Sequence, residues 1–507
     1  MSELTVVVLA AGGGTRMKSK TPKVLHEVAG RSMVAHVLAT VQALGPARVV
    51  TVVGHQRELV EPHVNGLLPE GVVAVQAEQL GTAHAVRMAV EAVGLDQPDR
   101  AGSGTVLVAY ADTPLLRTES LRALLDDHAS AGNAVTILSG VVPDPFGYGR
   151  IVRDGDGGVD AIVEEKDASD EQRRITEINS GILAFDAAFL AEALGRIGND
   201  NAKGEYYLTD AVALARAAGL HVGARPVEDP AEIEGANDRA QLAALGKELN
   251  RRIVEAWMRA GVTVVDPATT WIDADAELAP DVTLLPGVQL LGATKVEEDA
   301  VVGPDSTLKD CEIRAGARVV RTHAELAVVG ADAEVGPFSY LRPGTILGAG
   351  GKIGGFVETK NARIGDGAKV PHLSYVGDAE IGEGTNIGAG TIFANYDGVA
   401  KHRTTVGSHA KTGSNNTFIA PVTIGDGAST GGGTVVRGEV PPGALAVSAG
   451  PLRVIEGWAQ RRRPGTKQAA AAEAASSGTH GEQRDEHEAS HNDQSGVGRT
   501  PTGASES

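Results

Sequence analysis

The chain has 507 residues, enough for about two or three domains, and a formal net charge of −19 at pH 7. That charge argues against a nucleic-acid or anionic-membrane partner, so a phosphate-bearing substrate would need local cations. No apolar run approaches the roughly 20 residues that span a bilayer, and no leader pattern is visible at the N-terminus. The single cysteine, Cys311, excludes an intrachain disulfide framework. We therefore expect a cytoplasmic protein that does not bind membranes.

The first motif joins a short apolar strand to a glycine turn and three cations. Residues 6–9 predict a buried strand, which Gly12, Gly13 and Gly14 end abruptly. Glycines in this place allow close backbone approach to a phosphate, and Arg16, Lys18 and Lys23 add positive charge. The spacing fits neither the dinucleotide fingerprint nor the P-loop. A bare glycine turn can be structural, but the added cations favour a nucleoside triphosphate site.

The next segments predict an open α/β sheet. Helical spacing over 33–44 alternates with strands at 47–53, 72–75 and 105–109, which is the doubly wound pattern. Gln76 follows the third strand at the sheet edge where such folds bind ligands, and its amide can read a pyrimidine. The alternative interpretation of this segment is a polar loop capped by Thr82.

Further polar segments are ambiguous when read by themselves. Asp112 follows an apolar strand, so it is either a turn residue or a magnesium ligand. Residues 146–151, 161–168 and 177–182 are typical of surface hairpins. Residues 203–210 are expected to open a helix with an acidic first turn.

The second half changes character after a predicted connecting helix at 239–260. Aliphatic residues then recur every sixth position over long runs, such as Val329, Val335, Leu341, Leu347 and Ile353. A period of six predicts a hexapeptide β-helix, in which each coil turns one aliphatic side chain inward per strand. Few aromatic residues (3%) and 65 glycines agree with such tight, repeated turns. Residues 395–403 interrupt the period and predict a loop that leaves the coil.

The opening motif, Leu-Ala-Ala-Gly-x-Gly-Thr-Arg-Met followed by Pro-Lys, resembles the signature of sugar-1-phosphate nucleotidyltransferases. Together with the hexapeptide repeats, it resembles the bifunctional family that joins an N-acetylglucosamine-1-phosphate uridyltransferase to a glucosamine-1-phosphate acetyltransferase. The resemblance runs from residue 4 to about 464. It implies a Rossmann-like domain at 1–239, a linker helix at 240–260 and a left-handed parallel β-helix at 261–464. The composition of residues 465–507 predicts a disordered tail.

The resemblance implies a uridyltransferase site that uses UTP and Mg²⁺. Arg16 and Lys23 would neutralise phosphate charge, and Asp112 and Asn237 would hold the metal. Ala111 stands where relatives often have glycine. The substrate ligands implied in this domain are Leu9, Ala10, Ala11, Gly12, Lys23, Gln76, Gly81, Thr82, Tyr110, Asp112, Gly149, Glu164, Asn179 and Asn237.

The resemblance also implies an acetyltransferase site on the β-helix that uses acetyl-coenzyme A. A lone histidine is usually structural, but His372 matches the family's general base. Such sites lie between subunits, so a homotrimer is expected, and Trp458 would pack on a neighbouring subunit. The implied substrate ligands here are Arg342, Lys360, Tyr375, Asn386, Ala389, Asn395, Tyr396, Ser414 and Gly432.

The function implied by the resemblance is the production of UDP-N-acetylglucosamine, a precursor of cell-wall polymers, from small-molecule substrates. One alternative is another sugar-1-phosphate nucleotidyltransferase whose β-helix only assembles or regulates. The other is a non-catalytic nucleotidyltransferase-like subunit of a translation-factor exchange complex. Such subunits typically lose the phosphate-binding arginine and lysine, which this chain keeps.

Overall fold

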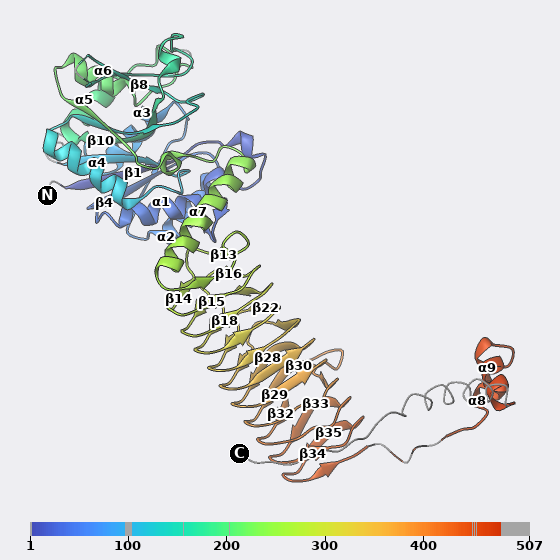
Figure 1. The fold of residues 1–507 in the computed structure, drawn as a ribbon. Helices are drawn as coiled ribbons and strands as arrows, with labels where there is room; N and C mark the ends of the chain where they lie inside the picture. The colour runs from blue at the N-terminus through green and yellow to red at the C-terminus, as the bar shows by residue number, and fades with distance from the viewer. Residues whose placement is uncertain are drawn as a thin grey trace, which may run out of the picture. The chain divides into compact units, whose positions relative to one another are not determined.

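The computed structural model describes residues 3–96, 104–155, 157–201, 203–448, 450, 452 and 454–477. The chain divides into two compact units, Met1–Val447 and Ser448–Ser507. The first unit contains an α/β domain, a long helix and a stack of short parallel strands (Figure 1). This order agrees with the order of segments predicted from the sequence.

The α/β domain is built on a mixed nine-stranded sheet with the order β11-β7-β10-β6-β1-β4-β5, to which the β8–β9 hairpin is attached. Strand β1 pairs in parallel with β4 and β6, whereas β10 runs antiparallel to β6 and β7. A separate small hairpin, β2–β3, follows the glycine loop. The strands are β1 (Leu4–Ala10), β2 (Glu27–Val28), β3 (Arg31–Ser32), β4 (Arg48–Val53), β5 (Val72–Val75), β6 (Thr105–Tyr110), β7 (Val135–Val141), β8 (Arg150–Arg153), β9 (Val159–Val163), β10 (Glu177–Asp186) and β11 (Val222–Pro226).

Helices cover both faces of this sheet, because successive side chains of β1 point to opposite sides. Val6 and Val8 pack on α1 (Met33–Gln42), α2 (Arg57–Leu67) and α4 (Thr118–Ala131). Val7 and Leu9 pack on α3 (Thr82–Ala92), α5 (Ala187–Arg196) and α6 (Asp210–Ala217). The short helices are η1 (Thr15–Met17), η2 (Lys23–Leu25), η3 (Gln172–Arg174) and η4 (Pro230–Ile233).

One helix start differs from the prediction. The segment from Lys203 was expected to open a helix, but α6 begins only at Asp210. Residues 205–208 instead lie against the loop before α3, where Tyr206 N–H donates to Leu80 O at 2.8 Å. These backbone groups are therefore used between segments rather than within a helical turn.

The long helix α7 (Arg239–Arg259) connects the domain to the strand stack. The Asp238 carboxylate caps its start by accepting from the N–H groups of Ala240 and Gln241. The buried Asn250 amide donates to Thr270 O at 2.8 Å in the first coil. On the domain side, Arg252 donates to Leu115 O at 2.9 Å. The helix is thus bonded to both parts of the first unit.

The predicted hexapeptide repeat forms a left-handed parallel β-helix, seen as successive coils in Figure 1. Each coil contributes short strands that pair in parallel with the coils before and after it. The strands are β12 (Thr263–Val264), β13 (Trp271–Ile272), β14 (Glu277–Leu278), β15 (Thr283–Leu284), β16 (Gln289–Leu291), β17 (Lys295–Val296), β18 (Val301–Val302), β19 (Thr307–Lys309), β20 (Glu312–Ile313), β21 (Arg318–Val319), β22 (Thr322–Glu325), β23 (Val328–Val329), β24 (Glu334–Val335), β25 (Ser339–Leu341), β26 (Ile346–Leu347), β27 (Lys352–Gly355), β28 (Glu358–Ile364), β29 (Lys369–His372), β30 (Tyr375–Ile381), β31 (Ile392–Ala394), β32 (Thr404–Val406), β33 (Thr417–Ile424), β34 (Ser429–Thr430), β35 (Val435–Val440) and β36 (Leu445–Ala446).

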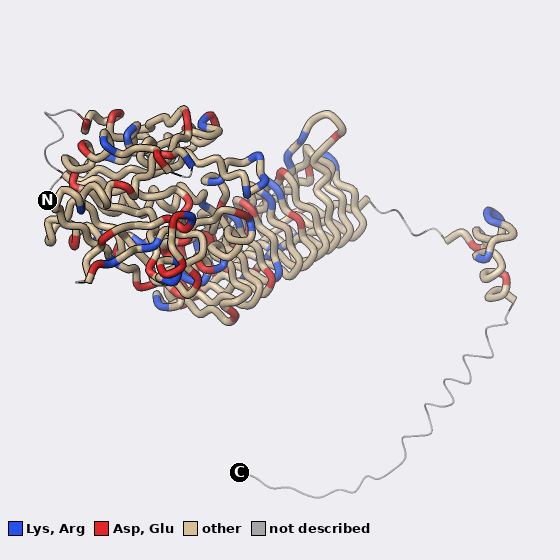
Figure 2. Tube along the Cα trace, turned by 90° about the horizontal axis from the view of Figure 1, so that it is seen from above, with Lys and Arg blue, Asp and Glu red and all other residues tan. Residues whose placement is uncertain are grey.

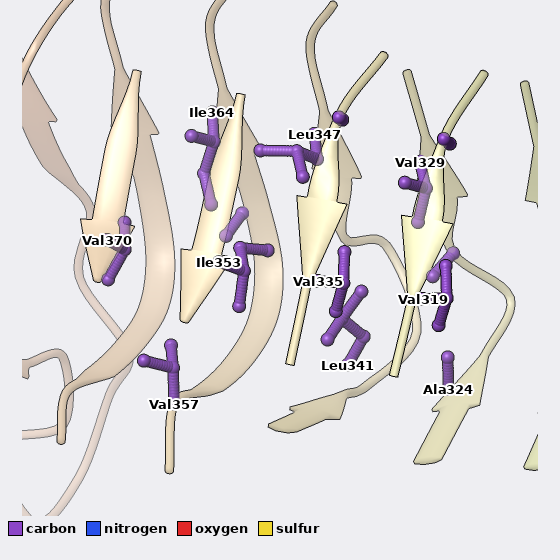
Figure 3. Close-up of a cluster of buried hydrophobic side chains, with 14 of the residues drawn as sticks. Val319, Ala324, Val329, Val335, Leu341, Leu347, Ile353, Val357, Ile364 and Val370 are labelled. Atoms are coloured by element: carbon purple, nitrogen blue, oxygen red, sulfur yellow. The ribbon is translucent and has the colours of Figure 1, made fainter. Parts of the chain in front are cut away.

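The core of the β-helix is made of the side chains with the six-residue period. Val335, Leu341, Leu347 and Ile353 are at most 2% exposed and lie along the inside of the coils (Figure 3). This confirms that the period marks inward-facing positions. The interruption predicted at 395–403 lies between β31 and β32, outside any strand, and Tyr396 and Lys401 form an isolated bridge within it.

The second unit contains α8 (Trp458–Arg462) and α9 (Lys467–Ser476). The prediction of disorder over 465–507 is wrong for α9. Its run of alanines has the highest intrinsic helix propensity, and the Thr466 hydroxyl caps its start by accepting from Ala469 N–H. Residues 478–507 lie outside the described part of the chain. The guanidinium of Arg463, directly after α8, lies 4.9 Å from the centre of the Trp458 ring; packing of Trp458 on a neighbouring subunit stays a prediction.

Charges of both signs are interspersed over the α/β domain and the coils (Figure 2). In the described residues, no helix is both long and apolar enough to span a membrane.

Candidate active sites

The glycine loop places cations at the carboxyl end of β1. Gly14 has a φ of +54°, which favours glycine. The one-turn helix η1 follows, and the side chain of its last residue, Met17, is buried. The Arg239 guanidinium of α7 donates to Met17 O at 3.3 Å and ties the loop to the start of the long helix. The side chain of Arg16 is exposed on η1.

Lys23 connects three segments that are far apart in the sequence. Its ammonium forms an ion pair with Asp112, at the end of β6, and donates to Asn237 Oδ1 at 2.9 Å. All three side chains are partly buried. The two residues predicted to hold a metal therefore turn their oxygens toward one point, together with one of the predicted phosphate ligands.

These oxygens fit a magnesium ion by their chemistry, since Mg²⁺ prefers carboxylate and carbonyl oxygens and keeps water and substrate phosphates as its other ligands. Their shared contact with the Lys23 ammonium shows that the place attracts a cation. A Cβ added at Gly235 would lie 3.2 Å from Asp112 Oδ2, so the chain passes closely beside this carboxylate. Within the described ranges, no group of three or more His, Cys, Asp or Glu side chains is placed to hold a metal.

A cavity of about 300 Å³ opens beside this cluster, at the carboxyl ends of β1 and β6. It collects ten of the predicted uridyltransferase ligands. Its lining residues are Leu9, Ala10, Ala11, Gly12, Lys23, Val24, Gln76, Gln79, Gly81, Thr82, Ala85, Tyr110, Asp112 and Glu205.

Gln76 is buried, and its amide nitrogen is already used within the loop. It donates to Gly81 O at 3.0 Å and lies 3.1 Å from His84 Nδ1. Its contact with a nucleobase stays a prediction. Gly81, with a φ of +113°, precedes α3 as its N-cap, so the alternative interpretation in which Thr82 caps the helix is wrong. The Thr82 hydroxyl instead accepts from Leu208 N–H at 2.9 Å.

A second cavity of about 450 Å³ shares Thr82, Tyr110 and Glu205 with the first. Two of the predicted sugar ligands, Glu164 and Asn179, line it. Its other lining residues are Phe146, Gly147, Glu165, Lys166, Asp167, Lys203, Tyr207 and Thr209. The predicted ligand Gly149 lies beside Glu164, since a Cβ added there would be 3.4 Å from Glu164 Oε1.

Burial changes the acidity of two groups in this second cavity. The pKa of Glu164 is raised, mainly by burial, against the lowering effect of Lys203. Burial also raises the pKa of the Tyr110 phenol, with further contributions from Asp112 and Glu164. The cavity thus contains a carboxylate that is costly to ionise, facing space that could hold hydroxyl and amide donors.

On the β-helix, four of the predicted acetyltransferase residues form a column along one corner of the coils. Gly390 N–H donates to His372 O at 3.1 Å, Asn415 N–H to Ala389 O at 2.7 Å, and Gly433 N–H to Ser414 O at 2.8 Å. His372, Ala389, Ser414 and Gly432 are therefore equivalent positions of four successive coils. The His372 side chain is exposed on this column.

The two predicted phosphate ligands lie next to each other in neighbouring coils, because Arg342 N–H donates to Thr359 O at 2.9 Å, one residue before Lys360. A third cation, Lys401 of the interrupting loop, contacts Lys360. The ammonium of Lys401 is the first cause that lowers the pKa of Lys360, followed by burial and Arg342. Sequence reasoning missed Lys401, although its place in the loop beside Asn395 and Tyr396 was a usable signal.

The remaining predicted sugar ligands differ in their burial and in their partners. Asn395 is buried and its amide donates to Asp378 Oδ2 at 2.5 Å. Tyr375 follows His372 by three residues, on β30. Tyr396 is 60% exposed and donates to Gly398 O within the loop. Asn386 is not part of the His372 column. Its backbone forms isolated parallel β-bridges with Lys369 and Lys411.

Comparisons with known proteins find relatives of both the α/β domain and the β-helix. Residues 6–155 match the model of the MobA-like NTP transferase domain. The bifunctional protein GlmU of Kineococcus radiotolerans is 58% identical over 93% of this chain and 94% of its own length. The bifunctional protein GlmU of Rhodococcus opacus is 59% identical over 93% of this chain and 95% of its own length. The chain belongs to the GlmU family. The bifunctional protein GlmU of Streptomyces avermitilis, 58% identical, is matched over 98% of its length, so the GlmU match covers both the α/β domain and the β-helix.

We expect the replacement Glu164→Gln to stabilise the protein at neutral pH. A raised carboxyl pKa in the folded state means that ionising the group disfavours folding above that pKa. The glutamine variant should therefore have the higher melting temperature at pH 8. The difference should shrink as the pH falls toward the unfolded-chain pKa of about 4.3.

The control is Glu171→Gln, which removes an exposed carboxylate in the same region. Thermal melts of the three proteins between pH 5 and about pH 8 make the comparison. A variant that melts below the native chain at pH 8 would contradict this account of Glu164.

Proposed function

We propose that this chain is a bifunctional enzyme that produces UDP-N-acetylglucosamine in two steps. The β-helix acetylates glucosamine-1-phosphate from acetyl-coenzyme A, and the α/β domain transfers uridylyl from UTP to the N-acetylglucosamine-1-phosphate formed. The observation that supports this best is that one chain carries both a Lys23–Asp112–Asn237 cluster beside paired cavities and a four-coil column headed by His372.

In uridylyl transfer, a sugar phosphate oxygen attacks the α-phosphorus of UTP in line, and pyrophosphate leaves. No side chain has to act as a nucleophile, so the protein contributes position and charge. The adjoining cavities would hold the nucleotide and the sugar on either side of Tyr110. Arg16 and Lys23 would bind phosphate oxygens and stabilise the charge that develops on them.

A magnesium ion, held by Asp112 and Asn237, would neutralise phosphate charge when it is bound. Lys23 contacts both of these residues, so its ammonium would remain beside the phosphates as a second cation. Gly235 lies against this carboxylate, where an added Cβ would come within 3.2 Å of Asp112 Oδ2.

In acetyl transfer, His372 would accept a proton from the glucosamine amine while the amine nitrogen attacks the thioester carbonyl. The new bond is an amide, and the thiolate of coenzyme A leaves. An imidazole suits this step because it titrates near neutral pH. Arg342, Lys360 and Lys401 would bind the sugar phosphate, with Tyr375, Asn386, Asn395 and Tyr396 around the sugar.

The acetyl-coenzyme A would lie along the corner column. Ala389, Ser414 and Gly432 repeat the position of His372 in the following coils, so a long, narrow cofactor could extend from the base along the stack. Their small side chains leave this corner open to it.

A homotrimer would complete this second site. Phe338, Phe356 and Leu373 occupy corners with φ values of +61°, +58° and +50°, which cost roughly 1–2 kcal/mol per non-glycine residue. Their side chains are 52%, 63% and 62% exposed, and the two phenylalanine rings stack at 5.3 Å. An exposed apolar stripe that ends beside His372 is typical of a surface covered by another copy of the chain.

The substrates UTP and acetyl-coenzyme A are soluble metabolites, which agrees with the predicted cytoplasmic location. That location stays a prediction from the sequence.

We expect Lys23→Ala to lose uridylyl transfer by at least about a hundredfold, because it removes a charge that stabilises the transition state. Acetyl transfer, more than 300 residues further along the chain, should stay near the native rate. The two activities are followed separately, by pyrophosphate release from UTP and by thiol release from acetyl-coenzyme A. An equal loss of both activities would contradict the assignment of separate sites.

We expect the native chain to have the mass of three copies in light-scattering measurements. Phe356→Ser should dissociate the trimer and reduce acetyl transfer, while uridylyl transfer persists. Leu220→Ser, which changes an exposed leucine of the α/β domain, is the control and should leave the trimer intact. A native chain that stays monomeric while acetyl transfer proceeds would contradict the shared site.

A further inference from the structure

A buried arginine lies behind the second cavity of the α/β domain. Arg150, the first residue of β8, is 1% exposed and is among the largest fully buried side chains of the described residues. Its guanidinium donates to Glu165 Oε2 at 2.6 Å and to the carbonyl oxygen of Tyr148. The predicted sugar ligands do not include Arg150.

The pair fixes the geometry of two loops at once. Glu165 Oε2 also accepts from Gly147 N–H at 3.3 Å, so one carboxylate oxygen holds the 146–149 turn and the end of β9 together. The nearby Arg173 guanidinium lies 3.8 Å from the other oxygen. These contacts lower the pKa of the Glu165 carboxyl, with Arg150 as the first cause.

The predicted sugar ligands are the immediate neighbours of this pair in the chain. Gly149 precedes Arg150, and Glu164 precedes Glu165. In the β8–β9 register Arg150 lies opposite Val163, so Gly149 comes opposite Glu164. Both Glu164 and Glu165 line the cavity, but Glu165 is held by Arg150, whereas Glu164 lies against Gly149.

The pair is a poor way to gain stability. The Arg150 side chain is 2% exposed and that of Glu165 21%, so the cost falls on the guanidinium, whose desolvation the attraction of one partly exposed carboxylate often fails to recover. In the described structure the Arg150 Nε is buried without a hydrogen-bond partner. A charge kept at such a position points to a role in specifying geometry.

We propose that Arg150 is a positioning residue for the sugar-phosphate substrate: through Glu165 it sets the direction of Glu164 and the distance between Gly149 and Glu164. This inference rests on the proposed uridylyl transfer and deepens it. Loss of the pair should weaken binding of N-acetylglucosamine-1-phosphate, while UTP, bound in the first cavity, is affected little.

The test compares Arg150→Met, Glu165→Gln and the double variant with a control pair whose arginine, Arg153, lies on the same strand as Arg150. Arg153 donates to Glu177 through two nitrogens at 2.8 and 2.7 Å, and neither residue lines the cavity. Arg153→Met and Glu177→Gln therefore remove a second Arg–Glu pair, which joins the end of β8 to the start of β10.

We expect the KM for N-acetylglucosamine-1-phosphate to rise about tenfold in each variant of the Arg150 pair, because a small displacement of a ligand weakens substrate positioning strongly. The double variant should be no worse than the single ones, since both act through one contact. The KM for UTP should stay within about twofold, and the control pair should change neither constant. Glu165→Gln keeps the test informative if Arg150→Met does not fold.

Four results would overturn the proposal. An unchanged sugar-phosphate KM with a lowered melting temperature would make the pair a structural ion pair only. An equal rise of the KM values for the sugar phosphate and for UTP would mean that the pair supports the whole site and does not position the sugar ligands specifically. A native chain that releases no pyrophosphate from UTP would remove the proposed function and this inference with it, whereas an active native chain with unaffected variants would remove this inference alone.

Discussion

Parallel strand pairing is the constraint on which both candidate sites depend. A parallel ladder brings equivalent positions of successive segments to the same edge, however far apart they are in the sequence. In the α/β domain the carboxyl ends of β1 and β6 thereby place the glycine loop beside Asp112. In the β-helix the same ladder turns His372 and Ser414 into members of one column. A shift of register by one residue would remove both arrangements.

Much of this could be predicted from the sequence because the signals are local or periodic. The glycine loop after a strand, the strand before Asp112 and the six-residue period are each visible in one stretch of chain. In the structure the side chains with the six-residue period are buried in the core of the β-helix, as predicted. The interruption at 395–403 lies outside the strands. The family resemblance, now supported by relatives that match over almost the whole chain, supplied the pairing of distant residues such as Asp112 and Asn237.

The contacts that sequence reasoning missed are those decided by packing between segments. Nothing near Lys23 indicates that its ammonium would contact both predicted metal ligands. Lys401 joins the phosphate cations because the loop at 395–403 brings its ammonium to Lys360. Arg150 reads as a polar residue of a surface hairpin, yet it is buried by the loops that it holds. The helix α9 was missed although its signal is local. The overall composition of residues 465–507 predicted disorder, and the run of alanines within it was not weighed separately.

The most direct test of the central claim, that one chain carries two independent chemistries, is a paired assay of the native chain and His372→Ala. Thiol release is followed with acetyl-coenzyme A and glucosamine-1-phosphate, and pyrophosphate release with UTP and N-acetylglucosamine-1-phosphate. His409→Ala, an exposed histidine on another corner of the β-helix, is the control. We expect the native chain to catalyse both reactions and His372→Ala to lose only thiol release. A native chain that releases pyrophosphate but never thiol would contradict the central claim and leave the β-helix as a scaffold.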